Sequence, residues 1–153
     1  MKFLCDSMLG NLAKWLRMMG YDVKYADDDE EDAEILQHAA SSKRILLTRD
    51  KEIIGRRSDA QMLLVKSSDV DEQIKQVVFE FKLSPGKNAI LSLCSECGEK
   101  LQPVDKGEVF GKVPDGVFAR QDEFWQCPDC GKLYWKGSHY NKIVEKIESL
   151  LKP

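Results

Sequence analysis

The chain has 153 residues and a formal net charge of −3, with 42% hydrophobic and 32% charged residues. This balance excludes a disordered or fibrous chain and fits one ordinary domain, alone or with a small module. The net charge argues against a broadly basic nucleic-acid coat but leaves room for a local basic groove. No apolar run approaches the roughly 18–20 residues that cross a bilayer, and Asp6 comes too early for a signal peptide. A cytoplasmic protein without membrane contact is expected.

The first half of the chain alternates short apolar runs with segments of helical periodicity. The apolar runs, which are short enough to be strands, are 2–5, 23–26, 45–48 and 62–65. The segments with helical spacing are 7–19, 33–40, 51–57 and 67–81. We expect Ser7 to cap the first of these helices and Ser68 to cap the last, with Asp71 completing a capping box. The alternation predicts an α/β domain with a parallel sheet flanked by helices on both faces.

The second half differs in composition. The run Ser84-Pro85-Gly86-Lys87-Asn88 is typical of a linker, and residues 89–139 are rich in turns around two cysteine pairs. The amphipathic tail 140–151 predicts a closing helix, with Ser138 as its expected cap. The expected organisation is therefore an α/β domain over 1–88 and a small cysteine-containing module with a closing helix over 89–153.

Four of the five cysteines form two Cys-x-x-Cys pairs: Cys94, Cys97, Cys127 and Cys130. Without a signal peptide, this spacing indicates a zinc site rather than disulfides. Four thiolates fill a tetrahedral site and leave no open position, so the predicted Zn²⁺ is structural. Free or redox-active thiols are the alternative. A zinc module of this kind is suited equally to contacting nucleic acid and to bracing the fold. Cys5 is expected to be a small buried hydrophobe.

Carboxylates follow the predicted strands. Asp6 and Asp50 come after the first and third strands, and Asp32 is placed to begin a helix at the same edge. Ligands of open parallel sheets bind beyond the carboxyl ends of the strands. Converging carboxylates repel one another unless a cation binds, and hard oxygen ligands suit Mg²⁺ or Mn²⁺, which activate water in phosphodiester hydrolysis. The alternative makes Asp6 and Asp32 ordinary helix caps and the acidic run 27–31 a solvated loop.

Basic residues surround the predicted acidic edge. Six lie near Asp50 in the sequence: Lys43, Arg44, Arg49, Lys51, Arg56 and Arg57. Lys14 and Arg17 belong to the helix that follows Asp6, and Arg17 emerges among apolar residues, which favours a carboxylate or phosphate partner. Together these side chains are suited to hold phosphates beside a metal site, with a solvated charged face as the alternative for several of them.

Other α/β active sites match less well. The chain has no Gly-x-Gly-x-x-Gly or Walker-type loop after a strand and no Gly-x-Ser-x-Gly elbow. Its only histidines are His38 and His139, which leaves little scope for a histidine-based hydrolase.

Several motifs, in this order, resemble a known family. They are Phe3-Leu4-Cys5-Asp6-Ser7-Met8-Leu9-Gly10, Leu12-Ala13-Lys14-Trp15-Leu16-Arg17, Gly20-Tyr21-Asp22, Ile45-Leu46-Leu47-Thr48-Arg49-Asp50, the two cysteine pairs, and Tyr134-Trp135-Lys136-Gly137-Ser138-His139. Together they resemble the Mut-seven C-terminal domain family, which joins a PIN-like ribonuclease fold to a zinc ribbon. The resemblance covers nearly the whole chain and implies a metal-dependent ribonuclease with RNA as its partner.

Carried over residue by residue, the resemblance makes Asp6, Asp32 and Asp50 the catalytic acids that hold Mg²⁺ or Mn²⁺. Many PIN domains have a further acid shortly after the Thr-Arg-Asp motif, at a position where this chain has Ile53. Glu52 is the neighbouring acid that is available to substitute for it.

The substrate-binding residues expected from this hypothesis are Arg17, Arg49, Lys14 and His139. The two arginines would steady the phosphate, while His139 and Trp135 would lie at the RNA surface, where an aromatic ring stacks on an unpaired base. A second hypothesis is a non-catalytic RNA- or ribonucleoprotein-binding module that keeps the PIN-like fold. A third is an adaptor that binds a protein partner and has no RNA affinity.

Overall fold

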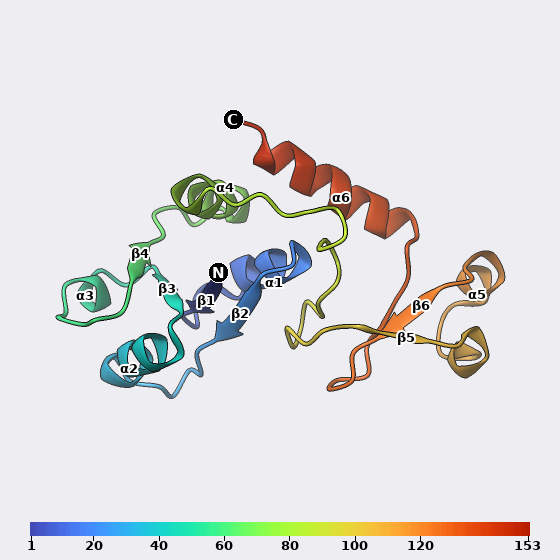
Figure 1. The fold of residues 1–153 in the computed structure, drawn as a ribbon, viewed down its shortest axis with the longest axis horizontal. Helices are drawn as coiled ribbons and strands as arrows, with labels where there is room; N and C mark the ends of the chain where they lie inside the picture. The colour runs from blue at the N-terminus through green and yellow to red at the C-terminus, as the bar shows by residue number, and fades with distance from the viewer.

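Four short parallel strands lie at the centre of the first half of the chain (Figure 1). In the computed structural model, which describes residues 1–153, they are β1 (Lys2–Cys5), β2 (Asp22–Tyr25), β3 (Ile45–Thr48) and β4 (Met62–Leu64). Their order across the sheet is β2-β1-β3-β4, and every neighbouring pair runs parallel. The parallel sheet predicted from the alternating pattern is confirmed.

Helices cover both faces of this sheet, as predicted. They are α1 (Gly10–Met18), α2 (Asp32–Ser42), α3 (Lys51–Ile54), α4 (Val70–Phe81) and α6 (Ser138–Leu151). Because side chains alternate along a strand, Phe3 and Cys5 pack against α1, α4 and α6 on one face. Leu4, between them, packs against α2 and α3 on the other face. No helix of the chain has the length and apolar character that a membrane span needs.

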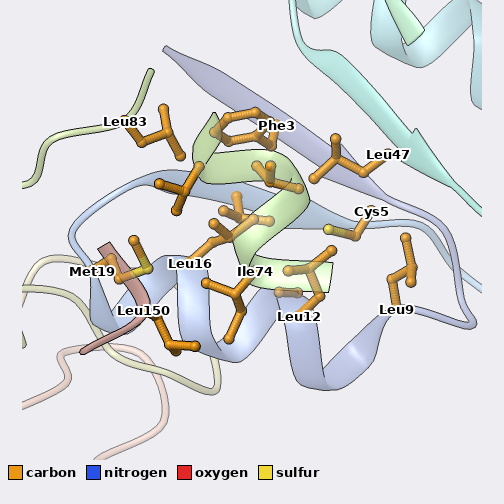
Figure 2. Close-up of a cluster of buried hydrophobic side chains, with 14 of the residues drawn as sticks. Phe3, Cys5, Leu9, Leu12, Leu16, Met19, Leu47, Ile74, Leu83 and Leu150 are labelled. Carbon is orange, nitrogen blue, oxygen red and sulfur yellow. The ribbon is translucent and has the colours of Figure 1, made fainter. Parts of the chain in front are cut away.

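The C-terminal helix completes the core of the first half. Ile147 and Leu150 of α6 belong to the same buried cluster as the α1 and α4 side chains, and Figure 2 shows Leu150 within that cluster. At the rim, the Lys146 Nζ lies 3.1 Å from Asp71 Oδ1 in α4 and 4.7 Å from the centre of the Trp15 ring. The helix that follows the ribbon in sequence therefore packs against the α/β domain.

The expected caps Ser7, Ser68 and Ser138 are wrong. α1 begins only at Gly10, because the chain first turns after β1. Asp69, the neighbour of Ser68, caps α4 by accepting a hydrogen bond from a backbone N–H of its first turn at 3.0 Å. Ser138 is itself the first residue of α6 and provides no side-chain cap.

A second, antiparallel sheet forms the ribbon. Its strands, in the order β5-β6-β7, are β5 (Gln102–Val104), β6 (Phe124–Gln126) and β7 (Leu133–Tyr134). Between β5 and β6 lie the short 3₁₀ helix η1 (Lys106–Val109) and α5 (Asp115–Arg120), on the right of Figure 1. Val109, Val113 and Phe124 form a small core there. The turn-rich composition of 89–139 does not predict α5.

A buried arginine joins the strands at the edge where they begin. Arg44 is 8% exposed, and its guanidinium donates to the main-chain oxygens of Phe3 and Asp22 at 3.1 and 3.3 Å. It also donates to Asp22 Oδ1 at 2.9 Å. This position corrects the prediction that grouped Arg44 with Asp50, because β3 separates the two residues and directs them to opposite edges of the sheet.

We expect Asp22→Asn to lower the free energy of unfolding near neutral pH and to lose this effect in acid. Partial burial raises the pKa of Asp22, but the hydrogen bond and the charge of Arg44 lower that pKa below its ordinary value. A depressed pKa contributes stability above the unfolded-state value of about 3.9, and this contribution is lost as the pH falls through the folded-state value. Because the Asp22 side chain is about half-exposed, solvent screening limits the effect to about 1 kcal/mol or less.

Urea midpoints of the wild type and of Asp22→Asn, measured in parallel from neutral to acid pH, test this. The difference between the two proteins should shrink toward low pH. A difference that grows instead would contradict the role given to Arg44.

Candidate metal centre and acidic edge

The four paired cysteines converge at one end of the ribbon. Cys94 and Cys97 precede β5, Cys127 and Cys130 lie between β6 and β7, and their sulfur atoms all lie within 4.8 Å of one another. None forms a disulfide, and the Sγ atoms of Cys94 and Cys130 are 3.7 Å apart. Four sulfurs bound tetrahedrally at about 2.3 Å from Zn²⁺ lie about 3.8 Å apart. The donor set and its spacing therefore fit a structural zinc ion, as predicted.

Both cysteine pairs are held by the same tight turn. The N–H of Gly98 donates to the oxygen of Cys94 at 2.8 Å, and the N–H of Gly131 donates to the oxygen of Cys127 at 3.0 Å. The two glycines have φ values of +77° and +79°, a conformation that other residues rarely adopt. The pattern Cys-x-x-Cys-Gly thus encodes the turn as well as the ligands.

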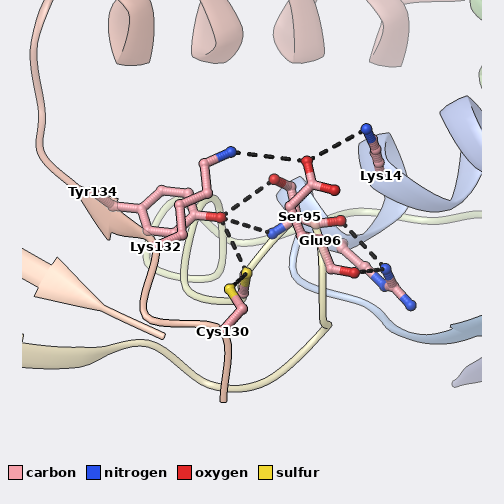
Figure 3. Close-up of polar contacts among 8 residues, drawn as sticks. Lys14, Ser95, Glu96, Cys130, Lys132 and Tyr134 are labelled. Carbon is pink, nitrogen blue, oxygen red and sulfur yellow. Dashed lines mark hydrogen bonds and ion pairs between the residues drawn. The ribbon is translucent and has the colours of Figure 1, made fainter. Parts of the chain in front are cut away.

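Tyr134 in β7 supports one of the sulfur ligands (Figure 3). Its hydroxyl lies 3.1 Å from Cys94 Sγ and accepts a hydrogen bond from the Ser95 N–H at 3.2 Å. Burial raises the pKa of the Cys94 thiol, but hydrogen bonds from Tyr134 and from the backbone of the turn lower it to about 7. Because the thiolate is the form that binds a metal, this hydrogen bond favours the ligating state of Cys94.

Asp6 joins the carboxyl ends of β1 and β3. The residue is 5% exposed, and its Oδ2 accepts hydrogen bonds from Thr48 Oγ1 and, at 3.0 Å, from the Arg49 N–H. Its Oδ1 accepts from the Met8 N–H at 2.9 Å. Thr48 Oγ1 in turn accepts from the Asp50 N–H at 3.0 Å. Asp6, Thr48 and Asp50 therefore form a chain of hydrogen bonds across neighbouring strand ends.

The two strand-end acids have different local roles. Asp6 turns the chain before α1 but does not cap that helix, because Leu9 holds the cap position. Asp50 does cap α3, since its Oδ1 accepts from the Glu52 N–H at 2.9 Å. This hydrogen bond leaves the second carboxylate oxygen of Asp50 available at the edge of the sheet.

Asp32 stands apart from this pair. It is the first residue of α2, and its Oδ2 lies 3.6 Å from an Arg56 nitrogen. Glu31 holds the cap position, so the interpretation of Asp32 as a cap is wrong. The cysteines are the one group of three or more His, Cys, Asp or Glu side chains whose ligand atoms lie within 4.8 Å of one another. The carboxylate oxygens of Asp6, Asp32 and Asp50 therefore do not all lie within 4.8 Å of one another.

Arg17 is a structural residue, which corrects its prediction as a phosphate ligand. It is 7% exposed, and its Nε donates to the Val23 oxygen at 3.0 Å. One of its terminal nitrogens donates to the oxygens of Ser95 and Glu96 at 3.3 and 2.9 Å. In Figure 3, dashed lines to the main-chain oxygens of the labelled Ser95 and Glu96 mark these two contacts. Arg17 therefore ties α1 and β2 to the zinc ribbon and has little surface left for a substrate.

The other predicted substrate-binding residues are spread over the molecule. Arg49 is half-buried between Thr48 and Asp50, at the acidic edge. Lys14 lies on α1 with its Nζ 3.3 Å from Glu96 Oε1, facing the ribbon. His139 is exposed at the start of α6 and lines a cleft against the ribbon.

Sequence reasoning does not single out Thr48 or Tyr134, although each joins two parts of a site. Thr48 is the polar end of an otherwise apolar strand, next to Asp50, and that contrast is the signal that would have found it. Tyr134 follows the second cysteine pair closely, but its partner Ser95 lies in the other pair, and the sequence gives no indication of this pairing.

The family model of the Mut7-C RNAse domain matches residues 1–147. The matched range includes the strand-end acids, all four clustered cysteines and most of α6. Searches of curated proteins and of solved structures returned no match.

Proposed function

Because the chain belongs to the Mut7-C RNAse domain family, we propose that it hydrolyses RNA phosphodiester bonds at the carboxyl ends of β1 and β3 with a divalent cation. The observation that carries this location is the hydrogen-bonded chain of Asp6, Thr48 and Asp50. It fixes two acids from neighbouring parallel strands at the edge where open α/β sheets bind ligands.

Asp6, Asp32 and Asp50 are the residues that would hold Mg²⁺ or Mn²⁺. A bound ion of this kind supplies a water nucleophile at neutral pH and neutralises charge on the leaving oxygen. Carboxylates that ligate metals are themselves usually hydrogen-bonded, as Asp6 is by three donors. Asp32 contributes only when its carboxylate turns from Arg56 toward the strand ends.

Arg49 is the residue that would bind phosphate at this edge. Arg49 lies between Thr48 and Asp50 in the chain, and a guanidinium fork matches two phosphate oxygens, which supports this role. Arg56, which is half-exposed and pairs with Asp32, becomes a second phosphate ligand once Asp32 turns to the cation.

A second candidate function is an RNA-binding module that keeps the fold without the chemistry. It is favoured by the pairing of Asp32 with Arg56 and by the lack of a three-acid group within 4.8 Å. This function predicts RNA affinity that is independent of Mg²⁺ or Mn²⁺ and falls steeply with salt.

Asp50→Asn tests the ribonuclease. Asparagine still caps α3, so the substitution removes a charge without removing the cap. We expect the Mn²⁺-dependent cleavage of a labelled single-stranded RNA pool to fall about a thousandfold, since metal ligation is worth several kcal/mol in the transition state. The assay uses the zinc-loaded chain without chelators, together with Mn²⁺ binding measured by calorimetry.

Asp122→Asn is the control, because it removes the same charge from an exposed carboxylate of the ribbon that pairs with Lys106. It should cleave like the wild type. Equal cleavage by the wild type and Asp50→Asn would refute this site. If the wild type binds RNA but neither cleaves it nor binds Mn²⁺ in its presence, the non-catalytic function holds.

A further inference from the structure

Three adjoining clefts lie where the zinc ribbon meets the start of α6. Their volumes are about 210, 50 and 310 Å³, and all three share Leu91 and Tyr140. We call them together the junction groove, whose central cleft is lined by Leu91, Trp125, Tyr134, Trp135, Lys136 and Tyr140. The proposed catalytic edge uses none of these residues.

Aromatic side chains dominate the walls of the junction groove. Trp125 and Tyr134 come from β6 and β7, Trp135 follows β7, and Tyr140 lies in the first turn of α6. All four are partly exposed, so they present ring surface to solvent. Aromatic rings that remain partly open in a cleft are suited to receive other flat, apolar groups.

The junction groove is also basic, in a chain whose net charge is −3. Its linings include Lys87, Lys100, Lys132, Lys136 and His139, and no aspartate or glutamate. The Lys136 Nζ lies 5.3 Å from the centre of the Trp125 ring and 5.5 Å from that of Tyr140. Positive charge is thus held next to the aromatic rings, where an occupant with both negative and flat groups would meet both.

We infer that the junction groove binds unpaired RNA, with bases stacked on its aromatic rings and phosphates paired with its lysines. Flat bases alternating with phosphates match this combination, and base stacking on aromatic residues is how proteins hold single strands. A duplex keeps its bases inside the stack and offers no ring face to the groove. The inference rests on the proposed function for RNA as the substrate class, but not on catalysis.

The groove and the acidic edge lie at opposite ends of α1. The helix begins shortly after Asp6, and its last residue, Met18, lines the groove. Its nine residues span about 13 Å. A strand held in the groove must therefore extend across several nucleotides to reach the acids, so the groove binds a flanking segment and favours long single strands over short ones.

Tyr140→Ala and Lys136→Ala test the groove. Neither residue belongs to a buried core, so both variants should fold. The probe is a fluorescent oligouridine binding to the zinc-loaded full chain without Mg²⁺ or Mn²⁺. We expect Tyr140→Ala to weaken affinity about tenfold, by loss of one stacked base. Lys136→Ala should lower the slope of log affinity against log salt by about 0.7, the value for one phosphate of a single strand.

The matched controls are Lys142→Ala, an exposed lysine further along α6, and Phe79→Ala, an exposed aromatic residue on α4. Both should bind as the wild type does. Wild-type affinity in both Tyr140→Ala and Lys136→Ala would refute RNA binding in the groove. Equal affinity for a duplex would also refute it. So would binding of a peptide or of a second copy of the chain without any binding of RNA. Because oligouridine binding is measured without Mg²⁺ or Mn²⁺, a failure of groove binding and a failure of cleavage are separate results.

Discussion

Replacing Arg17 with methionine is expected to lower the free energy of unfolding by about 3–5 kcal/mol, because several buried main-chain oxygens lose their charged hydrogen-bond donor together. The guanidinium is buried and donates to three main-chain oxygens, those of Val23, Ser95 and Glu96. Methionine fills similar space but donates nothing, so buried oxygens lose their partners at about 1–3 kcal/mol each. For a chain of this length, the midpoint of thermal unfolding should fall by about 6–20 °C.

Lys14→Ala provides the matched control. Lys14 lies on the same helix and reaches the same ribbon residue, with its Nζ 3.3 Å from Glu96 Oε1, but both side chains are nearly half-exposed. Such surface pairs contribute about 0–1 kcal/mol. Calorimetric unfolding of the two zinc-loaded variants compares them directly. Equal losses in Arg17→Met and Lys14→Ala would show that the buried contacts do not hold the ribbon to the α/β domain.

Arg17 also shows where sequence reasoning stops. A charged residue among apolar neighbours predicts a partner, and Arg17 has one, but the partners are main-chain oxygens 78 and 79 residues away. Such oxygens belong to every residue and leave no trace in the sequence. Side-chain patterns therefore favour a carboxylate or phosphate as the partner of Arg17. The structure contradicts this interpretation, because Arg17 donates to the main-chain oxygens of Ser95 and Glu96.

The sheet was predictable because its signals are local. Runs such as Ile45–Thr48 are buried on both faces, so every residue but the last is apolar, and helices between them fix a parallel arrangement. The cap positions were not predictable, since Ser68 and Asp69 are equally good caps and tertiary packing decides between them. The acids at strand ends could be placed, whereas the pairing of Asp32 with Arg56 depends on how α2 and α3 pack.

We expect the ribbon to depend on bound zinc more than on its apolar core. Its buried apolar residues fall into two small groups. One of them is Cys94, Leu101 and Cys127, so two of its three members are predicted zinc ligands. Cores of this size rarely hold a fold on their own. The binding free energy of a structural zinc site, about 10–16 kcal/mol in small zinc domains, is then largely the folding energy of the ribbon.

Cys127→Ser is therefore expected to unfold the ribbon while leaving much of the α/β core folded. The variant should lose the zinc that the wild type retains and the near-ultraviolet circular dichroism of Trp125 and Trp135, which lie in or beside the ribbon strands. The far-ultraviolet circular dichroism should persist in part, because strands β1–β4 and helices α1–α4 form their own buried contacts. Zinc content after dialysis and the two circular dichroism spectra measure the outcome.

Cys5→Ala is the control, because Cys5 is a buried cysteine outside the metal site, and burial raises its pKa far above that of a ligating thiol. It should keep its zinc and its tryptophan signal. A Cys127→Ser protein with a full zinc complement and an unchanged near-ultraviolet spectrum would contradict the role of the metal. Because Arg17 bonds to the turn of the first cysteine pair, loss of zinc should also release this contact and lower the stability of the α/β core. The metal would then stabilise the sheet that carries the acids through one buried arginine.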